Sequence, residues 1–323
     1  MNTPHSSADK KGTLVISLDF ELHWGVFDKV DLKARWDYFL QTRKMIPELL
    51  ALFREHDIAV TWATVGMLFA RDKTTWEQYS PRQKPAYKQS RFSAYEWVKA
   101  NGGPFPEVHF APDLIEEVLK FPKQELGSHT FAHYYTLEEG QTAEAFREDL
   151  QAAQQIAKDT FGIALRSLVF PRNQYQRSYL KICMEEGFRV VRSNPGDWYW
   201  QDTHKETLAM RIFRTGDAYF PTGQSKVFEE QHLKVSEGLP LELPASRLLR
   251  AYHPKYPILN RLRLNRIFQE MEAASQSNGV YHLWWHPHNF GYHTAENMRD
   301  LEKILHMANS LGMVSKNMGD FVR

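Results

Sequence analysis

The chain has 323 residues, of which 42% are hydrophobic and 13% aromatic. A chain of this length and composition can bury a large core, and it fits either one α/β barrel or two smaller domains. Its formal net charge of +1 excludes a strong electrostatic attraction to nucleic acid or to an anionic membrane. The single cysteine, Cys183, excludes an intramolecular disulfide and a zinc site of the finger type. We therefore expect a small or weakly charged partner and no nucleic acid.

The N-terminal segment, residues 1–12, is polar and lacks the apolar core of a signal peptide. No apolar run in the sequence approaches the roughly 20 residues that are needed to span a bilayer. These features predict a poorly ordered tail over residues 1–12, no transmembrane segment and a cytoplasmic location. They leave the oligomeric state open.

The rest of the sequence alternates between buried strands and helices. An apolar run over residues 13–19 is followed by a helical pattern over 36–56 and by a second apolar run over 58–66. Strand, helix and strand within about fifty residues form a βαβ unit, which implies a parallel pair of strands. Further strands are expected at 125–129, 167–170, 189–192 and 280–285, and further helices at 112–121, 142–162, 175–186, 258–275 and 294–312.

Two stretches interrupt this alternation. Residues 71–112 combine polar side chains, prolines and scattered aromatic residues, which predicts an irregular loop or lid. Residues 201–255 are also irregular, and we expect them to hold a strand or two and an inserted connection. The sequence therefore predicts a single domain over residues 13–323 with insertions over 71–112 and 201–255.

Two histidines, His129 and His133, have a spacing that is typical of metal ligands. If the chain turns helically after His129, both imidazoles lie on one face and can bind the same ion. A third, oxygen ligand is expected from Asp19 or Glu21, which follow the first apolar run and lie two positions apart, on one face of a strand. The pattern predicts a metal-assisted hydrolase with one divalent metal, for which zinc is the first candidate.

Polar residues also gather at the carboxyl ends of the expected strands. In a parallel β/α barrel, the active site is assembled at this face from the ends of several strands. The pattern therefore favours one barrel over two domains. The residues concerned are Asp19, Glu21, His129, Arg172, Asp197 and His286.

The order of these motifs resembles the polysaccharide deacetylases of carbohydrate esterase family 4, with the NodB-homology fold, in a divergent branch. The resemblance covers residues 13–70, 110–200 and 278–320. It implies a distorted (β/α)7 barrel with inserted loops, and metal-dependent removal of an N- or O-acyl group, typically N-acetyl, from a sugar. The motifs that carry it are Ser17 to Glu21, Gly127 to His133, Pro171 to Gln174, Asp197 with Trp198, and His282 to His286.

The resemblance also implies the roles of the metal-binding and proton-transfer residues. Glu21, His129 and His133 would bind the metal, Asp19 would act as general base, and His286 would act as general acid. The family has two adjacent aspartates where this chain has Asp19 and, two positions later, Glu21, so these two carboxylates can exchange roles.

The remaining polar residues have less direct roles. Asp197 would orient or tune a catalytic histidine or arginine, or would cap a turn after Gly196, and Arg172 would hold the base or the oxyanion. His282 and His288 are alternatives to His286.

The predicted substrate is an acylated sugar or a glycan precursor of a cell-surface polysaccharide. Two alternatives remain open. A metal-independent glycosidase would use Asp19 or Glu21 with Asp197 as paired carboxylates. A non-catalytic barrel would bind carbohydrate without turning it over.

Overall fold

The structure is a computed structural model that describes residues 12–201, 203–204, 206–221, 223, 225–233 and 235–322. Its strands are β1 (Thr13–Phe20), β2 (Val60–Thr64), β3 (Gln124–Ser128), β4 (Ser167–Val169), β5 (Val190–Ser193), β6 (Leu241–Pro244), β7 (Arg247–Leu248), β8 (Val280–Trp285) and β9 (Val314–Lys316). Its α-helices are α1 (Trp36–Glu55), α2 (Lys73–Tyr79), α3 (Ala94–Asn101), α4 (Pro106–His109), α5 (Pro112–Leu119), α6 (Ala143–Phe161), α7 (Leu180–Glu185), α8 (Trp198–Gln201), α9 (Leu208–Gly216), α10 (Pro257–Ser277) and α11 (Thr294–Ser310).

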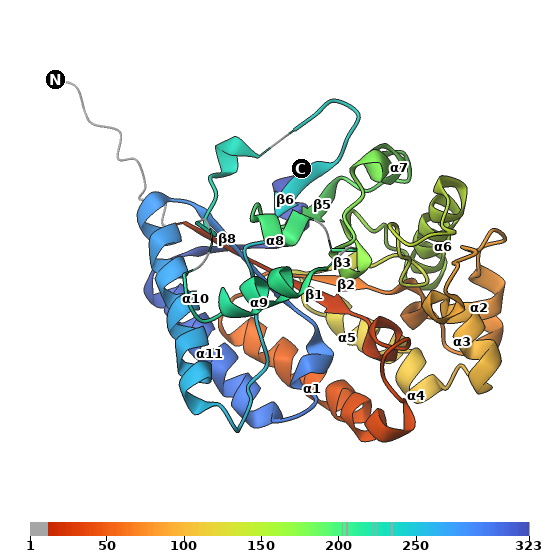
Figure 1. Ribbon diagram of the computed structural model, residues 1–323, viewed down its shortest axis with the longest axis horizontal. Coiled ribbons are helices and arrows are strands. Elements are labelled where there is room, and N and C mark those ends of the chain that lie inside the picture. Colours follow the sequence, from red (N-terminus) through yellow and green to blue (C-terminus); the bar gives the residue numbers. More distant parts are fainter. Residues whose placement is uncertain are drawn as a thin grey trace.

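The strands form one parallel sheet in the order β6-β5-β4-β3-β2-β1-β8-β7, with β9 paired to β1. The two ends of this order, β6 and β7, are consecutive along the chain. β6 pairs with β5, whereas β7 pairs with β8. At the junction, Ala245 N donates to Ser193 O and Ser246 N donates to His282 O. Residues 241–248 therefore close the sheet into a barrel, and the predicted distorted (β/α)7 fold is confirmed (Figure 1).

The helices that follow the strands cover the outside of the barrel. Figure 1 shows α10 and α11 (blue) on one side of β1 and α6 (yellow-green) on the other. Their ends follow ordinary capping chemistry. Thr142 caps α6 by accepting from Ala145 N, and Gly162 ends it with a left-handed backbone. Pro112 and Pro257 occupy the first turns of α5 and α10, where a missing N–H costs nothing.

β1 divides its side chains between the two sides of the barrel wall. The even-numbered residues from Leu14 to Phe20 belong to the large core between the sheet and the helices. Val15 belongs instead to a smaller cluster with residues of β2, β4, β5, β6 and β8. Because residues two apart in a strand point the same way, Ser17 and Asp19 share the inner face with Val15. The strand therefore delivers Asp19 to the interior at its carboxyl end.

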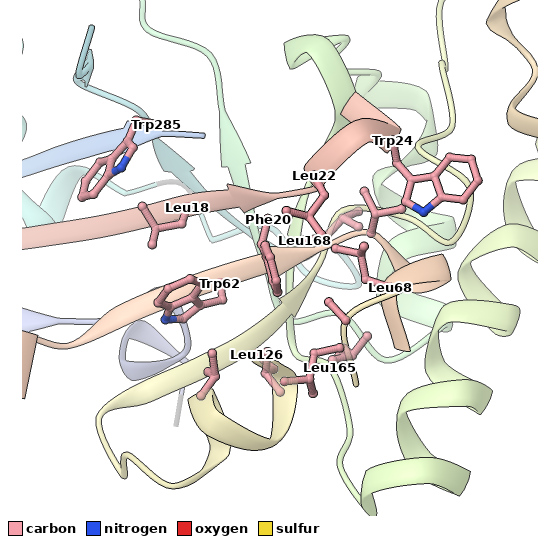
Figure 2. Close-up of a cluster of buried hydrophobic side chains, with 14 of the residues drawn as sticks. Leu18, Phe20, Leu22, Trp24, Trp62, Leu68, Leu126, Leu165, Leu168 and Trp285 are labelled. Carbon is pink, nitrogen blue, oxygen red and sulfur yellow. The ribbon is translucent and has the colours of Figure 1, made fainter. Parts of the chain in front are cut away.

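The outer face of β1 is held by large aromatic residues on both neighbouring strands. Leu18 is paired in register with Trp62 of β2 and with Trp285 of β8. All three side chains are fully buried, and the Phe20 ring meets the Trp62 ring edge-on at 5.8 Å between centroids (Figure 2). This layer fixes the strand from which Asp19 projects.

Two regions differ from the sequence-based expectations. Residues 71–112, predicted to be an irregular loop, contain α2, α3 and α4, because Asp72 and Ser93 supply N-caps for short helices that the prolines obscure. Residues 201–255, which were expected to form an insertion with a strand or two, contain α9 together with β6 and β7. These two strands are part of the barrel sheet itself.

Smaller differences concern single elements. The helix expected over 175–186 begins as α7 at Leu180, after a 3-10 turn. β9 was not predicted, since its three residues lack an apolar pattern. Residues 1–11 of the expected tail lie outside the described residues. In the described part of the chain, no helix is long and apolar enough to cross a membrane.

We predict that Leu18→Ala lowers the free energy of unfolding by about 2–5 kcal/mol, because the cavity lies between two immobile tryptophans and cannot collapse. Urea denaturation of metal-free protein measures this change. The matched control is Leu208→Ala, since Leu208 is 72% exposed and should change the free energy by less than about 0.5 kcal/mol. Similar losses for both variants would contradict the assignment of Leu18 to the core.

Candidate active site

Three side chains converge at the carboxyl ends of β1 and β3. Glu21 directly follows β1, and His129 directly follows β3. Glu21 Oε2 lies 3.3 Å from His129 Nε2 and 3.2 Å from His133 Nε2. The donor atoms of all three residues lie within 4.8 Å of one another, and all three side chains are buried. A carboxylate and two imidazoles in this arrangement match the ligand set of a zinc site with an open position.

The hydrogen bonds around these atoms fit a bound cation. Among the described residues, Glu21 Oε2 and His129 Nε2 are buried and have no hydrogen-bond partner. His129 Nδ1 donates to the carbonyl of Val169 over 2.9 Å, which leaves the lone pair on Nε2 facing Glu21. His133 Nδ1 shares a hydrogen bond of 3.1 Å with the Tyr135 hydroxyl. Buried polar atoms without partners are costly, and a divalent metal would satisfy them together.

The loop from His129 to His133 is not helical, so the expected helical turn was wrong. Thr130 and His133 instead have positive φ angles of 64° and 53°. The buried carboxylate of Asp149 holds the loop by accepting from Phe131 N over 2.6 Å and from Ala132 N over 3.1 Å. Two left-handed residues therefore bring the imidazoles together, and α6 fixes their backbone.

Asp19 is held by an arginine that the sequence analysis did not single out. Arg192 of β5 donates to Asp19 Oδ1 over 2.7 Å and to Oδ2 over 2.8 Å. It also donates to Ser17 Oγ over 3.0 Å and to Asn173 Oδ1 over 3.1 Å. Both partners of the ion pair are buried. One feature of the sequence could have indicated this role. Arg192 lies within a buried apolar strand, where a charged side chain must point into the barrel and needs a partner.

Arg172, which was predicted to hold the base or the oxyanion, lies elsewhere in the site. It forms an ion pair with Asp28, and its guanidinium lies 4.4 Å from the centre of the Tyr135 ring. Tyr135 in turn contacts His133, so Arg172 packs against the partner of a metal-ligand candidate. The arginine that contacts Asp19 is Arg192. The contact of Arg172 with an oxyanion stays a prediction.

The three histidines of the last motif have different surroundings. His286 Nε2 lies 3.6 Å from Asp19 Oδ2 and 3.7 Å from Glu21 Oε1, and the side chain is 26% exposed. His288 is buried, with Nδ1 3.7 Å from Glu21 Oε1. His282 lies deeper, where Nε2 contacts Ser17 Oγ over 2.8 Å and Nδ1 donates to the Pro244 carbonyl. His286 is thus the one of these three that both faces the carboxylates and remains open to solvent.

Asp197 forms an ion pair with Lys226, and Lys226 also lies 3.3 Å from Asp217. All three side chains are buried. This cluster joins the segment after β5 to the segment before β6. The role of Asp197 in orienting a catalytic histidine or arginine stays a prediction.

Burial and neighbouring charges shift the pKa values of Asp19, Glu21 and His133. Burial alone would raise the pKa of Asp19, but the Arg192 guanidinium and nearby imidazoles hold it below its ordinary value. Burial also opposes ionisation of Glu21, but the imidazoles of His286, His129 and His133 hold its pKa well below its usual range. Burial lowers the pKa of His133 to about 4, so this imidazole is neutral at pH 7. Ionised carboxylates and neutral imidazoles are the forms that bind divalent metals.

We predict that Gly25→Ala weakens zinc binding by roughly tenfold or more, because a methyl group at this position would overlap the Glu21 carboxylate and displace it from the histidines. Zinc titration calorimetry of metal-stripped protein measures the affinity. Gly216→Ala is the matched control, since its added methyl group meets nothing within 4 Å. Unchanged affinity in Gly25→Ala would argue against Glu21 as a ligand.

Asp149 predicts a pH-dependent stability. Burial raises the pKa of its carboxyl from 3.8 to about 7, although the two backbone N–H groups oppose this. The folded protein therefore holds this proton more tightly than the unfolded chain, so the stabilising contribution is complete below pH 3.8 and is lost as the pH rises through about 7. We expect the free energy of unfolding of the wild type, relative to Asp149→Asn, to fall between pH 3.8 and about pH 7 and to level off above that.

Urea denaturation in the presence of a chelator, repeated at each pH, measures that difference. Subtracting the variant removes the contribution of the buried histidines, which titrate in both proteins. A difference that stays constant with pH would contradict the raised pKa.

Comparison with known proteins agrees with the motifs. The polysaccharide deacetylase family profile matches residues 26–191, just over half of the chain. A Mycobacterium smegmatis structure classed with the polysaccharide deacetylases is 14% identical, with 99% of this chain and 92% of that chain covered and a TM-score of 0.61. Puue allantoinase is 13% identical, with coverage of 99% and 92% and a TM-score of 0.59.

A third structure, from Pseudomonas aeruginosa PAO1 and also classed with the polysaccharide deacetylases, is 13% identical, with coverage of 99% and 93% and a TM-score of 0.56. At such low identities these likenesses show the fold alone. No curated protein matches the sequence. The profile match spans half of the chain and includes both histidines of the converging triad, and the chain belongs to the polysaccharide deacetylase family.

Proposed function

We propose that the protein is a metal-dependent hydrolase that removes an N-acyl group, N-acetyl in the first instance, from a sugar or a surface-polysaccharide precursor. The observation that carries this proposal is the convergence of Glu21, His129 and His133 on one point beside the carboxylate of Asp19. Family membership supports the reaction class. The ligand set favours zinc, because imidazole nitrogen and carboxylate oxygen together suit zinc better than magnesium or calcium.

The hydrogen bonds favour Glu21 as the ligand and Asp19 as the base. Both oxygens of Asp19 already accept from Arg192, which holds the carboxylate in place and reduces its capacity to bind a cation. Glu21 Oε2 accepts no hydrogen bond from the described residues and faces both imidazoles. This difference supports Glu21 as the metal ligand and Asp19 as the base.

Hydrolysis then follows from the positions of the side chains. When bound, the metal would polarise the acyl carbonyl and make water more acidic. Asp19 takes a proton from the attacking water, and the water oxygen bonds to the acyl carbon. As the bond from carbon to nitrogen breaks, His286 donates a proton to the nitrogen, so the products are a carboxylic acid and an amino sugar. The 26% exposure of His286 supports this part, since the leaving group must reach it from solvent.

The glycosidase alternative is weaker on electrostatic grounds. That reaction needs a carboxylic acid that is protonated near neutral pH, and therefore a raised pKa. The pKa values of Asp19 and Glu21 are instead lowered, and Asp197 is paired with Lys226. A non-catalytic sugar-binding barrel is the second candidate. Measured turnover of a sugar substrate would exclude it. The identity of the sugar and a cytoplasmic location remain part of the proposal.

The test measures zinc content and the release of acetate from N-acetylated amino sugars and their oligomers. Wild-type protein should lose activity on chelation and regain it when zinc is restored. We predict that His129→Ala loses the metal of the active site and the activity. Asp19→Asn should keep the metal but lose roughly a hundredfold or more in kcat, because it cannot take the proton.

The outcomes separate the candidates. Full activity in chelator, with new reducing ends, would select the glycosidase. Tight sugar binding without turnover would select the binding barrel. If Asp19→Asn loses the metal while Glu21→Gln keeps it, the two carboxylates have exchanged roles.

A further inference from the structure

A second group of metal-ligand side chains lies at the opposite end of the barrel. His56 follows the last residue of α1 and precedes β2, so it is at the amino-terminal end of the strands. Glu302 and His306 belong to α11, which packs against α1. Glu21, His129 and His133 lie at the carboxyl ends of parallel strands, on the other side of the barrel.

The geometry of this group meets the requirements of a cation site. Glu302 and His306 are four residues apart on one helix and therefore share a face. The donor atoms of His56, Glu302 and His306 all lie within 4.8 Å of one another. The two imidazole rings are 4.6 Å apart between centroids and nearly perpendicular, at 87°. Crossed rings allow one nitrogen from each to face a common point, whereas stacked rings would turn their nitrogens outward.

The buried member of the group carries an independent sign of a missing ligand. His56 is only 6% exposed, and its Nε2 atom is buried without a hydrogen-bond partner among the described residues. Its other nitrogen, Nδ1, lies 3.2 Å from Asn309 Nδ2. The nitrogen and oxygen of a side-chain amide exchange places when the amide rotates by about 180°, and in that orientation Nδ1–H donates to the oxygen and the lone pair of Nε2 is free for a metal.

We propose that His56, Glu302 and His306 form a second divalent-cation site of the zinc class, which joins the end of α1 to α11. Two imidazoles and one carboxylate favour zinc over magnesium or calcium, which prefer oxygen ligands. The exposed Glu302 and His306 leave the fourth position to solvent. Because the site joins two helices, its role is structural.

A cation at this site links helices that flank β1. α1 follows β1 in the chain, and α11 lies between β8 and β9, the two strands other than β2 that pair with β1. Because the cation binds the folded chain only, the free energy of unfolding rises with zinc concentration. This inference is independent of the proposed function, since it involves neither the active-site ligands nor catalysis.

The experiment uses untagged, chelator-stripped protein, because an affinity tag of histidines would bind zinc itself. Zinc chloride is added by equilibrium dialysis, and bound metal is counted by elemental analysis. The wild type should bind two equivalents and His306→Ala one, with the deacylation rate of the zinc-loaded variant unchanged. His306 is exposed on a helix, and alanine favours helix there, so the variant should fold.

A variant that lacks the active-site ligands isolates the second site. In the double variant of His129→Ala and His133→Ala, one equivalent of zinc should remain and zinc should raise the thermal midpoint. Adding His306→Ala should abolish both effects. His232→Ala is the matched control, because His232 is also an exposed histidine beside a glutamate, Glu229, at 3.7 Å, and its loss should leave two equivalents.

The results distinguish this inference from the proposed function. Failure of the active-site assignment alone would leave the wild type with one equivalent that His306→Ala removes. The second site is refuted if His306→Ala binds as much zinc as its parent in both backgrounds and the thermal midpoint of the double variant does not respond to zinc.

Discussion

The ion pair between Arg192 and Asp19 crosses the interior of the barrel and fixes the geometry of the site. It joins β5 to β1, which are not neighbours in the sheet. Burying two charges is costly, and further contacts of the guanidinium reduce this cost. Its terminal nitrogens also donate to Ser17 and Asn173, and its central carbon lies 4.3 Å from the centre of the Trp284 ring. Loss of either partner would leave an isolated buried charge, which typically costs about 3–5 kcal/mol.

The barrel also contains a second buried carboxylate, that of Glu125. Glu125 of β3 accepts from Thr61 and Gly319, and it shares a hydrogen bond with Ser167. Burial raises the pKa of Glu125, although these hydrogen bonds oppose the rise. The same interior also contains an apolar cluster: Val15, Ala63, Val169, Val190, Leu241, Leu243, Val280 and Met318.

Most strands were predictable because buried parallel strands are continuous apolar runs, and the polar residues that end them stand out. Asp19, Glu21, His129 and His286 were found in this way, and the structure brings them together. The contact of Arg192 with Asp19 was not predictable, since it depends on how the barrel curls across strands that are far apart in the sequence.

Backbone conformations that a residue type rarely adopts also could not be predicted from the sequence. Thr130 and His133 adopt positive φ angles that neither residue favours, and the buried Asp149 on α6 holds the loop that contains them. The spacing of the histidines therefore predicted that the two imidazoles lie together, although the backbone between them is not helical. The β6–β7 stretch was also unclear, because four-residue and two-residue strands give too short a pattern.

The same ion pair lowers the basicity of the Asp19 carboxylate. A general base works best when its pKa is near the working pH, yet the guanidinium of Arg192 holds the pKa of Asp19 below its ordinary value. In the proposed mechanism, Asp19 would therefore take a proton from water that a bound cation had made more acidic.

His286 completes this scheme, because a proton on Asp19 must leave before the next turnover. Its Nε2 atom is 3.6 Å from Asp19 Oδ2, so a small movement would close a hydrogen bond through which the proton passes to the imidazole and then to the leaving amine. In the proposed mechanism, Asp19 and His286 would therefore act as one proton-transfer pair. Because Arg192 lowers the pKa of the Asp19 carboxyl, the proposed reaction would depend on the metal to make the water more acidic.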